Sequence, residues 1–321
     1  MKAVIPAAGV GTRLRPHTLN KPKALLPVAG RPILAHIVDD LAEAGIDGFI
    51  LIVGYQGQVV REWFAANRPE LAIAYVDQER RLGLGHAIWT AREAVDDQPF
   101  FCVLGDTILK ADYRALLQCP DNLIAVREVA DPRRFGVVVQ DGQRVTGFVE
   151  KPEVPPSNLA IVGAYLLRDS VALFAALERL VREDRRTRGE FQLTDGLQLM
   201  LEAGHVFRTV PVADWYDCGK ADTWLETNRV LLDRQAAAGG DSCYLDPTAR
   251  VDHSRLGPHV SLGPGVVVDH CDIADAVIGA GSVLRRCRLT HSLVGEACLV
   301  EGVTGSINLG DYCELTAKEQ R

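Results

Sequence analysis

The chain has 321 residues, of which 47% are hydrophobic and 24% charged, and its formal net charge is −7. This is the composition of a globular protein whose length predicts two domains, and the acidic balance excludes a broad nucleic-acid surface. No apolar run approaches the roughly 18 residues of a membrane helix and no CxxC pair occurs, so we expect free thiols, no membrane partner and a cytoplasmic location.

From the N-terminus to about residue 235, short apolar segments alternate with segments of helical periodicity. We expect strands in KAVIPAA, GFILIVGY, LAIAYVDQ and FFCVLGD, and helices in PILAHIVDDLAEAGI, GQVVREWFAAN and GHAIWTAREAV. Continuous apolar strands separated by helices predict an α/β fold with a doubly wound, mainly parallel, Rossmann-like sheet covered on both faces. Ligands of such sheets lie beyond the carboxyl ends of the strands.

Residues 123–170 read differently, as strands with hairpin-like breaks, which predicts an antiparallel edge or subdomain. Helices return at SVALFAALERLVRE and LTDGLQLMLEAG. A last long helix, ADTWLETNRVLLDRQAAA, ends at Gly239-Gly240. Because paired glycines interrupt a helix, we place the boundary there, between a first domain of residues 1–238 and a second of residues 241–321.

The second domain contains an internal repeat. Residues 263–278 align without gaps on 279–294 and partly on 295–310, with a glycine at the head of each segment. The aliphatic spacing follows a hexapeptide pattern, in which short parallel strands stack in coils, and it resembles the left-handed β-helix of hexapeptide-repeat proteins. Cys271 and Cys287 coincide in the alignment, and we interpret them as small hydrophobic residues that face inward.

A glycine loop follows the first predicted strand and is rich in positive charge: Gly9, Gly11 and Thr12 precede Arg13, Arg15, Lys21 and Lys23. Such a turn offers backbone N–H groups to a phosphate chain. A P-loop would continue Gly-Lys-Ser/Thr, whereas this loop continues GTRL. A dinucleotide fingerprint needs a third glycine and an acidic residue about 20 residues later. Leu14 and the lack of any acidic residue before Asp39 exclude it.

The remaining pattern, G-x-G-T-R-L-x-P with KPKALLPV shortly after it, resembles the signature of the sugar-nucleotidyltransferase family. The resemblance continues in the family's order through DQERRLGLGHA, VLGDT, RRFGVVV, FVEKP, SNLAIVGAYLL, GEFQLTD and WYDCGKADTWLETNRVLLD, over about residues 1–235. These enzymes join a sugar 1-phosphate to a nucleoside triphosphate and release pyrophosphate. Longer members also carry a hexapeptide-repeat tail, as in the glucose-1-phosphate thymidylyltransferases that this chain resembles most.

The resemblance implies a role for each matching residue. Arg13 would clamp the pyrophosphate side of the triphosphate and Lys23 would neutralise charge near the α-phosphate, as the catalytic pair. Asp106 and Asp217 would hold Mg²⁺, which prefers oxygen ligands. The implied nucleotide-binding residues are Ala8, Gly9, Gly11, Thr12, Arg13, Gln78, which reads the base, and Gly83. Those implied for the sugar phosphate are Gly136, Glu150, Lys151, Ile161 and Gly163.

The base and the sugar stay open at this stage. Ala8 and LGLGHA resemble glucose-1-phosphate uridylyltransferases, whereas SNLAIVGAYLL and GEFQLTD resemble the thymidylyltransferases. One methyl group separates dTTP from UTP, and such a contact is worth only about 1–3 kcal/mol. We expect dTTP with glucose 1-phosphate, then UTP, then GTP with mannose 1-phosphate. A non-catalytic nucleotide-sugar-binding subunit is the alternative from another class, and it would not need all four charged residues.

The histidines suggest further alternatives. The expected reaction needs no acid–base imidazole, so His17, His36 and His86 are interpreted as structural. Hexapeptide-repeat domains in other proteins transfer acyl groups, but His259, His270 and His291 follow no recognised acyltransferase motif. Because a short solenoid leaves its end coils exposed, we expect the tail to make capping or oligomer contacts in a homo-oligomer.

Overall fold

A computed structural model of the protein describes residues 1–317, which fall into two compact units. The first unit comprises Met1–Gly9 and His36–Trp215, and the second comprises Val10–Ala35 and the chain from Tyr216 onward. The segment 10–35, which carries most of the glycine-rich and basic motif, therefore groups with the C-terminal part of the chain. The boundary placed at Gly239-Gly240 falls inside the second unit and stays a prediction.

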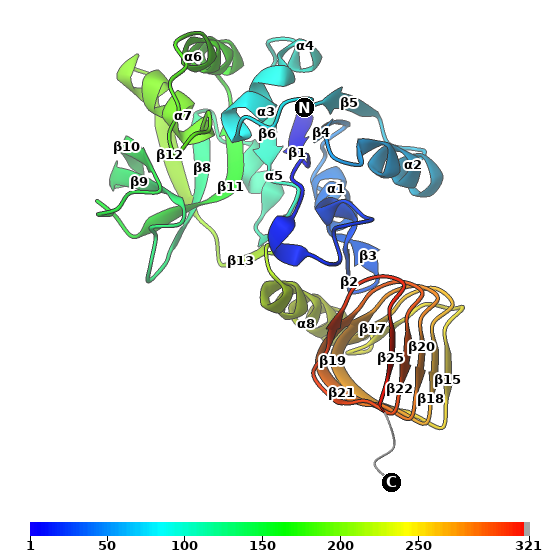
Figure 1. The fold of residues 1–321 in the computed structure, drawn as a ribbon. Helices are drawn as coiled ribbons and strands as arrows, with labels where there is room; N and C mark the ends of the chain where they lie inside the picture. Colours follow the sequence, from blue (N-terminus) through cyan, green and yellow to red (C-terminus); the bar gives the residue numbers. More distant parts are fainter. Residues whose placement is uncertain (318–321) are drawn as a thin grey trace. The chain divides into compact units, whose positions relative to one another are not determined.

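The first unit is built on a nine-stranded sheet with the order β5-β4-β1-β6-β11-β8-β12-β10-β9 (Figure 1). Strands β5, β4, β1 and β6 run parallel, as their continuous apolar sequences predicted. Strand β11 is antiparallel to both β6 and β8, and β9 and β10 form an antiparallel pair, in agreement with the hairpin breaks noted in residues 123–170. The strands of this unit are β1 (Lys2–Pro6), β4 (Gly48–Val53), β5 (Ile73–Asp77), β6 (Phe100–Val103), β7 (Thr107–Lys110), β8 (Asn122–Glu128), β9 (Gly136–Asp141), β10 (Arg144–Glu150), β11 (Leu159–Leu167) and β12 (Phe207–Pro211).

The helices of the first unit follow the predicted periodicity closely. The segment expected to be one helix over residues 85–95 is two, because the chain leaves helical hydrogen bonding at Ala91. Helices α3, α6 and α7 contact one another and share one hydrophobic core with the sheet. Within the described residues, no helix has the length and apolar character needed to cross a membrane. The helices are α1 (Ile33–Glu43, which begins in the second unit), α2 (Gly57–Asn67), α3 (Leu84–Thr90), α4 (Arg92–Val95), α5 (Tyr113–Leu117), α6 (Ser170–Arg182) and α7 (Leu193–Glu202).

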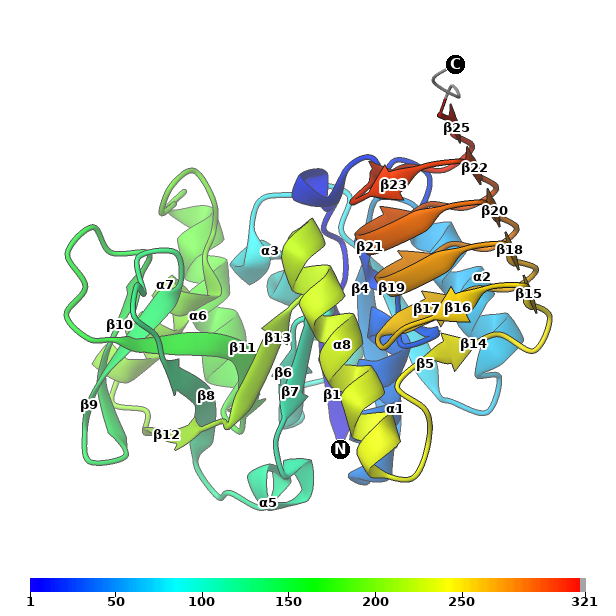
Figure 2. The ribbon, with the colours of Figure 1, turned by 90° about the horizontal axis from the view of Figure 1, so that it is seen from below.

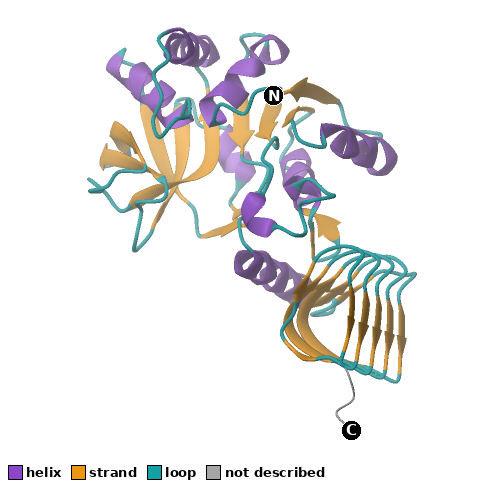
Figure 3. Ribbon diagram, viewed as in Figure 1, coloured by secondary structure: helices purple, strands orange, loops and turns teal. Residues whose placement is uncertain are grey.

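The second unit consists mainly of short parallel strands wound in stacked coils (Figure 3). Val268 pairs with Leu284, and Leu284 pairs with Val300, a step of 16 residues that matches the repeat seen in the sequence. One sheet of the coils contains β14 (Tyr244–Leu245), β16 (Arg255–Leu256), β17 (Val260–Leu262), β19 (Asp272–Ile278), β21 (Arg288–Val294), β23 (Thr304–Gly305) and β24 (Asn308–Leu309). The other contains β15 (Arg250–Asp252), β18 (Val267–Asp269), β20 (Val283–Arg285), β22 (Leu299–Glu301) and β25 (Glu314–Thr316). We call residues 244–316 the coil region.

The repeated residues of the coil region have clear structural reasons. Cys271 and Cys287 are 5% and 3% exposed and lie in the hydrophobic core of the coils, as the repeat predicted. A Cβ atom on Gly279 would lie 2.5 Å from the backbone of Gly295 on the next coil, so a larger residue has no room there. The corners of the coils recur as residues with positive φ, among them the columns 253, 270, 286, 302 and 265, 281, 297, 312. All eight cysteines are free thiols.

Helix α8 (Ala221–Ala237) lies along β19 and β21 of the coils (Figure 2). Asp233 on α8 accepts a 2.7 Å hydrogen bond from His259, and Arg229 donates to Asp275. Burial opposes ionisation of Asp275, but its bonds to Arg229 and His291 lower its pKa below the usual value. His259 and His291 therefore serve to dock the helix, in line with the absence of an acyltransferase motif around them.

Candidate active site

In the second unit, the glycine-rich loop brings two cations and one carboxylate together. Lys23 is buried and its Nζ lies 3.9 Å from Oδ1 of Asp217, at the end of β13 (Asp214–Asp217). A Cβ atom on Gly219 would lie 2.8 Å from Oδ1 of Asp217 and 3.1 Å from Nη2 of Arg13, so both side chains border the same glycine. Positive charge is thus concentrated around one carboxylate, which is the kind of environment that binds a phosphate chain together with a cation.

The turn at Gly11 fixes the course of this loop. Gly11 has φ 68°, a left-handed conformation that side chains rarely adopt, and it precedes the short 3-10 helix η1 (Thr12–Leu14). A Cβ atom there would come within 3.0 Å of the side chains of Lys23 and Thr18. The hydroxyl of Thr18 donates a 2.8 Å hydrogen bond to the carbonyl of Gly11, which closes the loop on itself. Gly11 thus allows Lys23, at the start of the 3-10 helix η2 (Lys23–Leu25), to approach the turn.

The same loop is anchored to the coils through His17. Only 4% of His17 is exposed, and its Nε2 lies 2.6 Å from Oδ1 of Asn308 on β24. Its ring packs edge-on against Trp224 at 5.1 Å, and the indole N–H of Trp224 donates to the carbonyl of Pro27. Burial lowers the pKa of His17, so the neutral imidazole donates from Nε2 to Asn308. The structural interpretation of His17 agrees with these contacts.

Two further contacts join the loop to the coils. Lys21 forms an ion pair with Glu296, so its charge is engaged by the coils. The glycines Gly263, Gly279, Gly295 and Gly310 form one column on successive coils. Gly310 is the fourth and packs against Pro16, because a Cβ atom on Gly310 would be 2.7 Å from the Cβ of Pro16. Nothing in the sequence of either segment marks the other as its neighbour, so this arrangement could not be predicted.

In the first unit, predicted residues gather where strands of the sheet end. Asp106 follows β6, and the preceding Gly105 donates a 3.0 Å backbone hydrogen bond to Pro6, which ends β1 just before Ala8. Leu104 donates to the carbonyl of Gly163 on β11, and a Cβ atom on Gly163 would be 2.6 Å from the Leu104 side chain. The structure therefore places Ala8, Asp106 and Gly163 close to the carboxyl ends of β1 and β6.

Gln78 lies after β5 and is buried. Its amide nitrogen lies 3.2 Å from the carbonyl of Gly83 and 3.3 Å from Nδ1 of His86 on α3. Burial, and then the charge of Arg80, lower the pKa of His86, so the neutral ring accepts from the amide. Gly83 has φ 111° and a Cβ atom there would lie 2.5 Å from the carbonyl oxygen of Phe191, which accounts for glycine at this position.

Glu150 is held at the end of β10 by two groups. Its Oε2 accepts a 2.7 Å hydrogen bond from the hydroxyl of Thr194, and its Oε1 lies 2.9 Å from Nζ of Lys151. A Cβ atom on Gly136 would lie 2.9 Å from the Thr194 hydroxyl, 3.0 Å from Glu150 and 3.2 Å from Ile161. These predicted residues therefore form one contiguous group. Thr194 was not predicted, although the motif GEFQLTD contains it and could have indicated it.

The predicted metal ligands are divided between the units: Asp106 belongs to the first and Asp217 to the second. Each fits Mg²⁺ by its donor atoms, since both are carboxylates at the ends of strands. The Asp217 side chain is 37% exposed. Asp106 has a neighbouring polar group, because the hydroxyl of Thr107 lies 3.2 Å from its Oδ1. Two of the predicted nucleotide-binding residues are divided in the same way. Gly9 is the last residue of the segment Met1–Gly9 in the first unit, and Thr12 is the first residue of η1 in the second unit.

Known proteins resemble this chain over most of its length. The family described as nucleotidyl transferase matches residues 2–234. The low-salt glycan biosynthesis nucleotidyltransferase Agl11 of Haloferax volcanii is 32% identical, and the match covers 92% of each chain. A glucose-1-phosphate thymidylyltransferase of Streptomyces griseus is 30% identical, again over 92% of each chain. A UDP-glucose pyrophosphorylase solved with UDP-glucose superposes with a TM-score of 0.64 at 27% identity, covering 73% of this chain and 98% of the other.

Proposed function

We propose, from the premise that this chain belongs to the sugar-1-phosphate nucleotidyltransferases, that it transfers a thymidylyl group from dTTP to glucose 1-phosphate and releases pyrophosphate. Nucleotidyl transfer onto a sugar 1-phosphate is the activity of the family. The base and the sugar are the proposed part. The observation that carries the proposal is the group of Arg13, Lys23 and Asp217 around Gly219.

In the proposed reaction, an oxygen of the sugar phosphate attacks the α-phosphorus of the triphosphate in line with the departing pyrophosphate. Such a transfer needs alignment and charge neutralisation more than covalent help from the protein. Arg13 binds the pyrophosphate side, because its planar guanidinium matches paired phosphate oxygens. Lys23, buried and therefore restricted in position, neutralises charge near the α-phosphate. The backbone N–H groups around Gly9, Gly11 and Thr12 receive phosphate oxygens.

Mg²⁺ is the cofactor that we assign to Asp106 and Asp217. When bound, the ion supplies positive charge to phosphate oxygens, which lowers the repulsion between the two anionic substrates. Asp217 lies 3.9 Å from Lys23, so the lysine partly neutralises this carboxylate when no ion is bound.

Gln78 supports a base that carries an imide N–H. Both donors of its amide nitrogen are taken up by Gly83 and His86, so the carbonyl oxygen of the same amide is the group that meets the base. A carbonyl accepts from the N–H of thymine, uracil or guanine, whereas cytosine and adenine present a ring nitrogen acceptor. The thymidylyltransferase from Streptomyces griseus supports dTTP as the first candidate, and the UDP-glucose pyrophosphorylase supports UTP as the second.

The test of this function is a screen of pyrophosphate release with dTTP, UTP, GTP, CTP and ATP against glucose, galactose, mannose and N-acetylglucosamine 1-phosphates. We expect the highest kcat/KM with dTTP and glucose 1-phosphate, UTP next, and rates lower by about a hundredfold for CTP and ATP, because a mismatched base leaves buried polar groups unpaired. A preference for GTP with mannose 1-phosphate would refute the proposed substrates, and a preference for CTP or ATP would refute the assigned role of Gln78.

The sugar-phosphate assignment makes a separate prediction through Gly136. The variant Gly136→Ala places a methyl group 2.9–3.2 Å from Thr194, Glu150 and Ile161, so we expect Glu150 to shift and the KM for glucose 1-phosphate to rise about tenfold. The control is Gly147→Ala on neighbouring β10, where the nearest atom is 3.7 Å away and the KM should not change. Steady-state kinetics in which both variants match the wild type would contradict the assignment.

The non-catalytic alternative makes the opposite prediction in that screen. A nucleotide-sugar-binding subunit would bind its ligand without releasing pyrophosphate from any pair. The presence of Arg13, Lys23, Asp106 and Asp217 together favours the enzyme, since binding alone does not require this set.

We further propose that the coil region is a left-handed β-helix of hexapeptide repeats and that its exposed end coils join copies of the chain in a homo-oligomer.

A further inference from the structure

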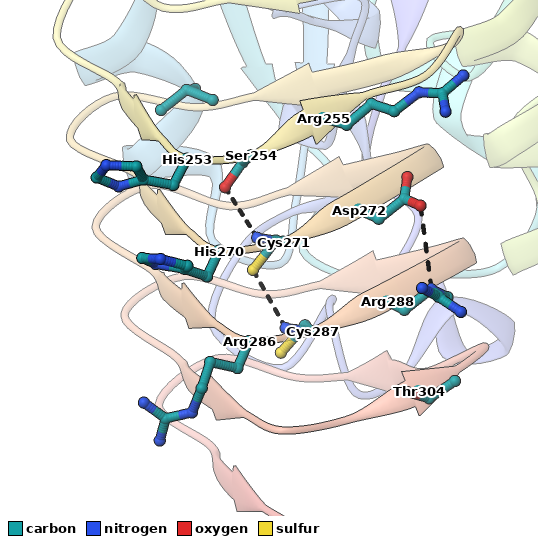
Figure 4. A pocket seen from close by; sticks show the side chains of 11 residues that line it. His253, Ser254, Arg255, His270, Cys271, Asp272, Arg286, Cys287, Arg288 and Thr304 are labelled. Atoms are coloured by element: carbon teal, nitrogen blue, oxygen red, sulfur yellow. Dashed lines mark hydrogen bonds and ion pairs between the residues drawn. The ribbon is translucent and has the colours of Figure 1, made fainter.

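The dipeptide Asp-His occurs on two successive turns of the coil region, as Asp252-His253 and Asp269-His270. Asp252 and Asp269 are in register on β15 and β18. His253 and His270 both have positive φ, 48° and 51°, so the same unusual corner directs both imidazoles. Their rings lie 4.7 Å apart and nearly parallel, one above the other on successive coils (Figure 4).

One carboxylate lies close to both imidazoles. Oδ1 of Asp269 is 2.7 Å from Nδ1 of His270 and 3.6 Å from Nδ1 of His253. One ligand atom from each of the three residues lies within 4.8 Å of the other two. Zinc bonds to nitrogen and oxygen are about 2.0–2.2 Å long, so two ligands of one ion lie within about 4 Å. The histidine side chains are 73% and 60% exposed, and a small rotation of them closes the difference.

Arginines on the next coil limit the cluster to a single cation. The next coil has Arg285 in register with Asp269, and Arg286 follows His270 in the corner column. Arg286 forms an ion pair with Glu301. A second ion on this coil would need a carboxylate at the position of Asp269, and Arg285 occupies that position. The ligand set is therefore confined to two coils, beside a hollow of about 660 Å³.

We propose that His253, Asp269 and His270 form a binding site for one divalent transition-metal ion, of which Zn²⁺ fits the donors best. Two imidazoles and one carboxylate are a set suited to zinc, nickel or copper, while magnesium takes oxygen ligands. Water completes the coordination on the exposed side. The ion would link two consecutive coils. This site is separate from the proposed Mg²⁺ ligands, which are carboxylates only, and it does not depend on the proposed reaction.

The experiment measures metal binding by the full chain after removal of metals with a chelator. Titration with Zn²⁺ against a metallochromic indicator should give one equivalent per chain, and a large excess of Mg²⁺ should not displace it. The variants His253→Gln and His270→Gln should each weaken binding by about tenfold or more. The matched control is His205→Gln, because His205 is also paired with a single carboxylate, Asp169, but has no second imidazole beside it within residues 1–317.

Cobalt distinguishes this site from the cysteines of the core. Co²⁺ bound to the full chain should show visible d–d absorption without a thiolate charge-transfer band, since Cys271 and Cys287 are buried. Circular dichroism checks that the variants fold, and Asp269→Asn serves as a second variant that preserves side-chain volume. A thiolate band, unchanged Zn²⁺ affinity in the folded variants, equal loss in His205→Gln, or no binding by the wild-type chain would each overturn the proposal.

Discussion

Replacing Asp217 by Asn is expected to lower kcat by about a hundredfold or more at saturating Mg²⁺, with the fold intact. The substitution keeps the shape of the side chain and removes the charge that we assign to the metal. It also removes the anion 3.9 Å from Lys23, in the group of charges bordering Gly219. Asp106→Asn should have an effect of similar size. Pyrophosphate release measured over a Mg²⁺ titration tests both, and higher Mg²⁺ should restore little activity.

The control for this prediction lies on the same strand. Asp214 is also on β13 and is ion-paired, with Lys110 at 3.9 Å, but it has no assigned role in the reaction. Asp214→Asn should therefore retain nearly wild-type kinetics and Mg²⁺ dependence. Rates near the wild-type value for Asp217→Asn or Asp106→Asn would show that the ion is held elsewhere.

Gly310→Ala is expected to lower kcat/KM by about tenfold to a hundredfold, although Gly310 lies on the coils and no role in chemistry is assigned to it. The added methyl group would meet Pro16 at 2.7 Å, so the loop or the coil has to shift. Because the loop carries Arg13 and Lys23, a shift of a fraction of an ångström misplaces both cations, and a misplacement of about 1 Å can cost a hundredfold in rate. Steady-state kinetics with varied triphosphate, where KM should also rise, checks this expectation.

The matched control is Gly263→Ala, at the first position of the same glycine column. Its added methyl group would meet only the next coil, with Ala280 N at 3.0 Å and Ile278 O at 3.2 Å. This variant should lower the Tm, as crowding in a packed interior does, but leave kcat/KM unchanged. Equal kinetic losses in the two variants would mean that the coils affect activity only through stability, and unchanged kinetics in Gly310→Ala would mean that this contact does not position the loop.

Much of the fold could be predicted because its signals are local. Helix α2 occupies the same residues, Gly57–Asn67, as the predicted amphipathic segment, and the 16-residue repeat predicted the pairing of Val268, Leu284 and Val300. Strand β12 was missed, because FRTVP is short and mixes polar and apolar residues. The antiparallel direction of β11 was predicted from the hairpin-like breaks, but its position between β6 and β8 was not, because neither strand is its neighbour along the chain.

The candidate site was predicted residue by residue, but its supports were not. Gln78, Glu150 and Gly83 could be recognised because each belongs to a motif written continuously along the chain. The hydrogen bonds that orient them come from His86 and Thr194. Thr194 is 44 residues from Glu150, a separation at which no local spacing predicts contact. Only the folded chain brings these two hydrogen-bond partners to the amide and to the carboxylate.

The sequence by itself determined the family, the alternation of strands and helices, the repeat of the coils and the positive charge of the glycine-rich loop. These depend on short-range patterns and on residue chemistry, which a linear chain displays directly. The tertiary structure alone decided that the loop 10–35 packs with the coils, through His17 and Asn308, and that His253 meets His270 across successive turns. Contacts of this kind follow from burial and backbone register over long separations, so they exist only once the whole unit has folded.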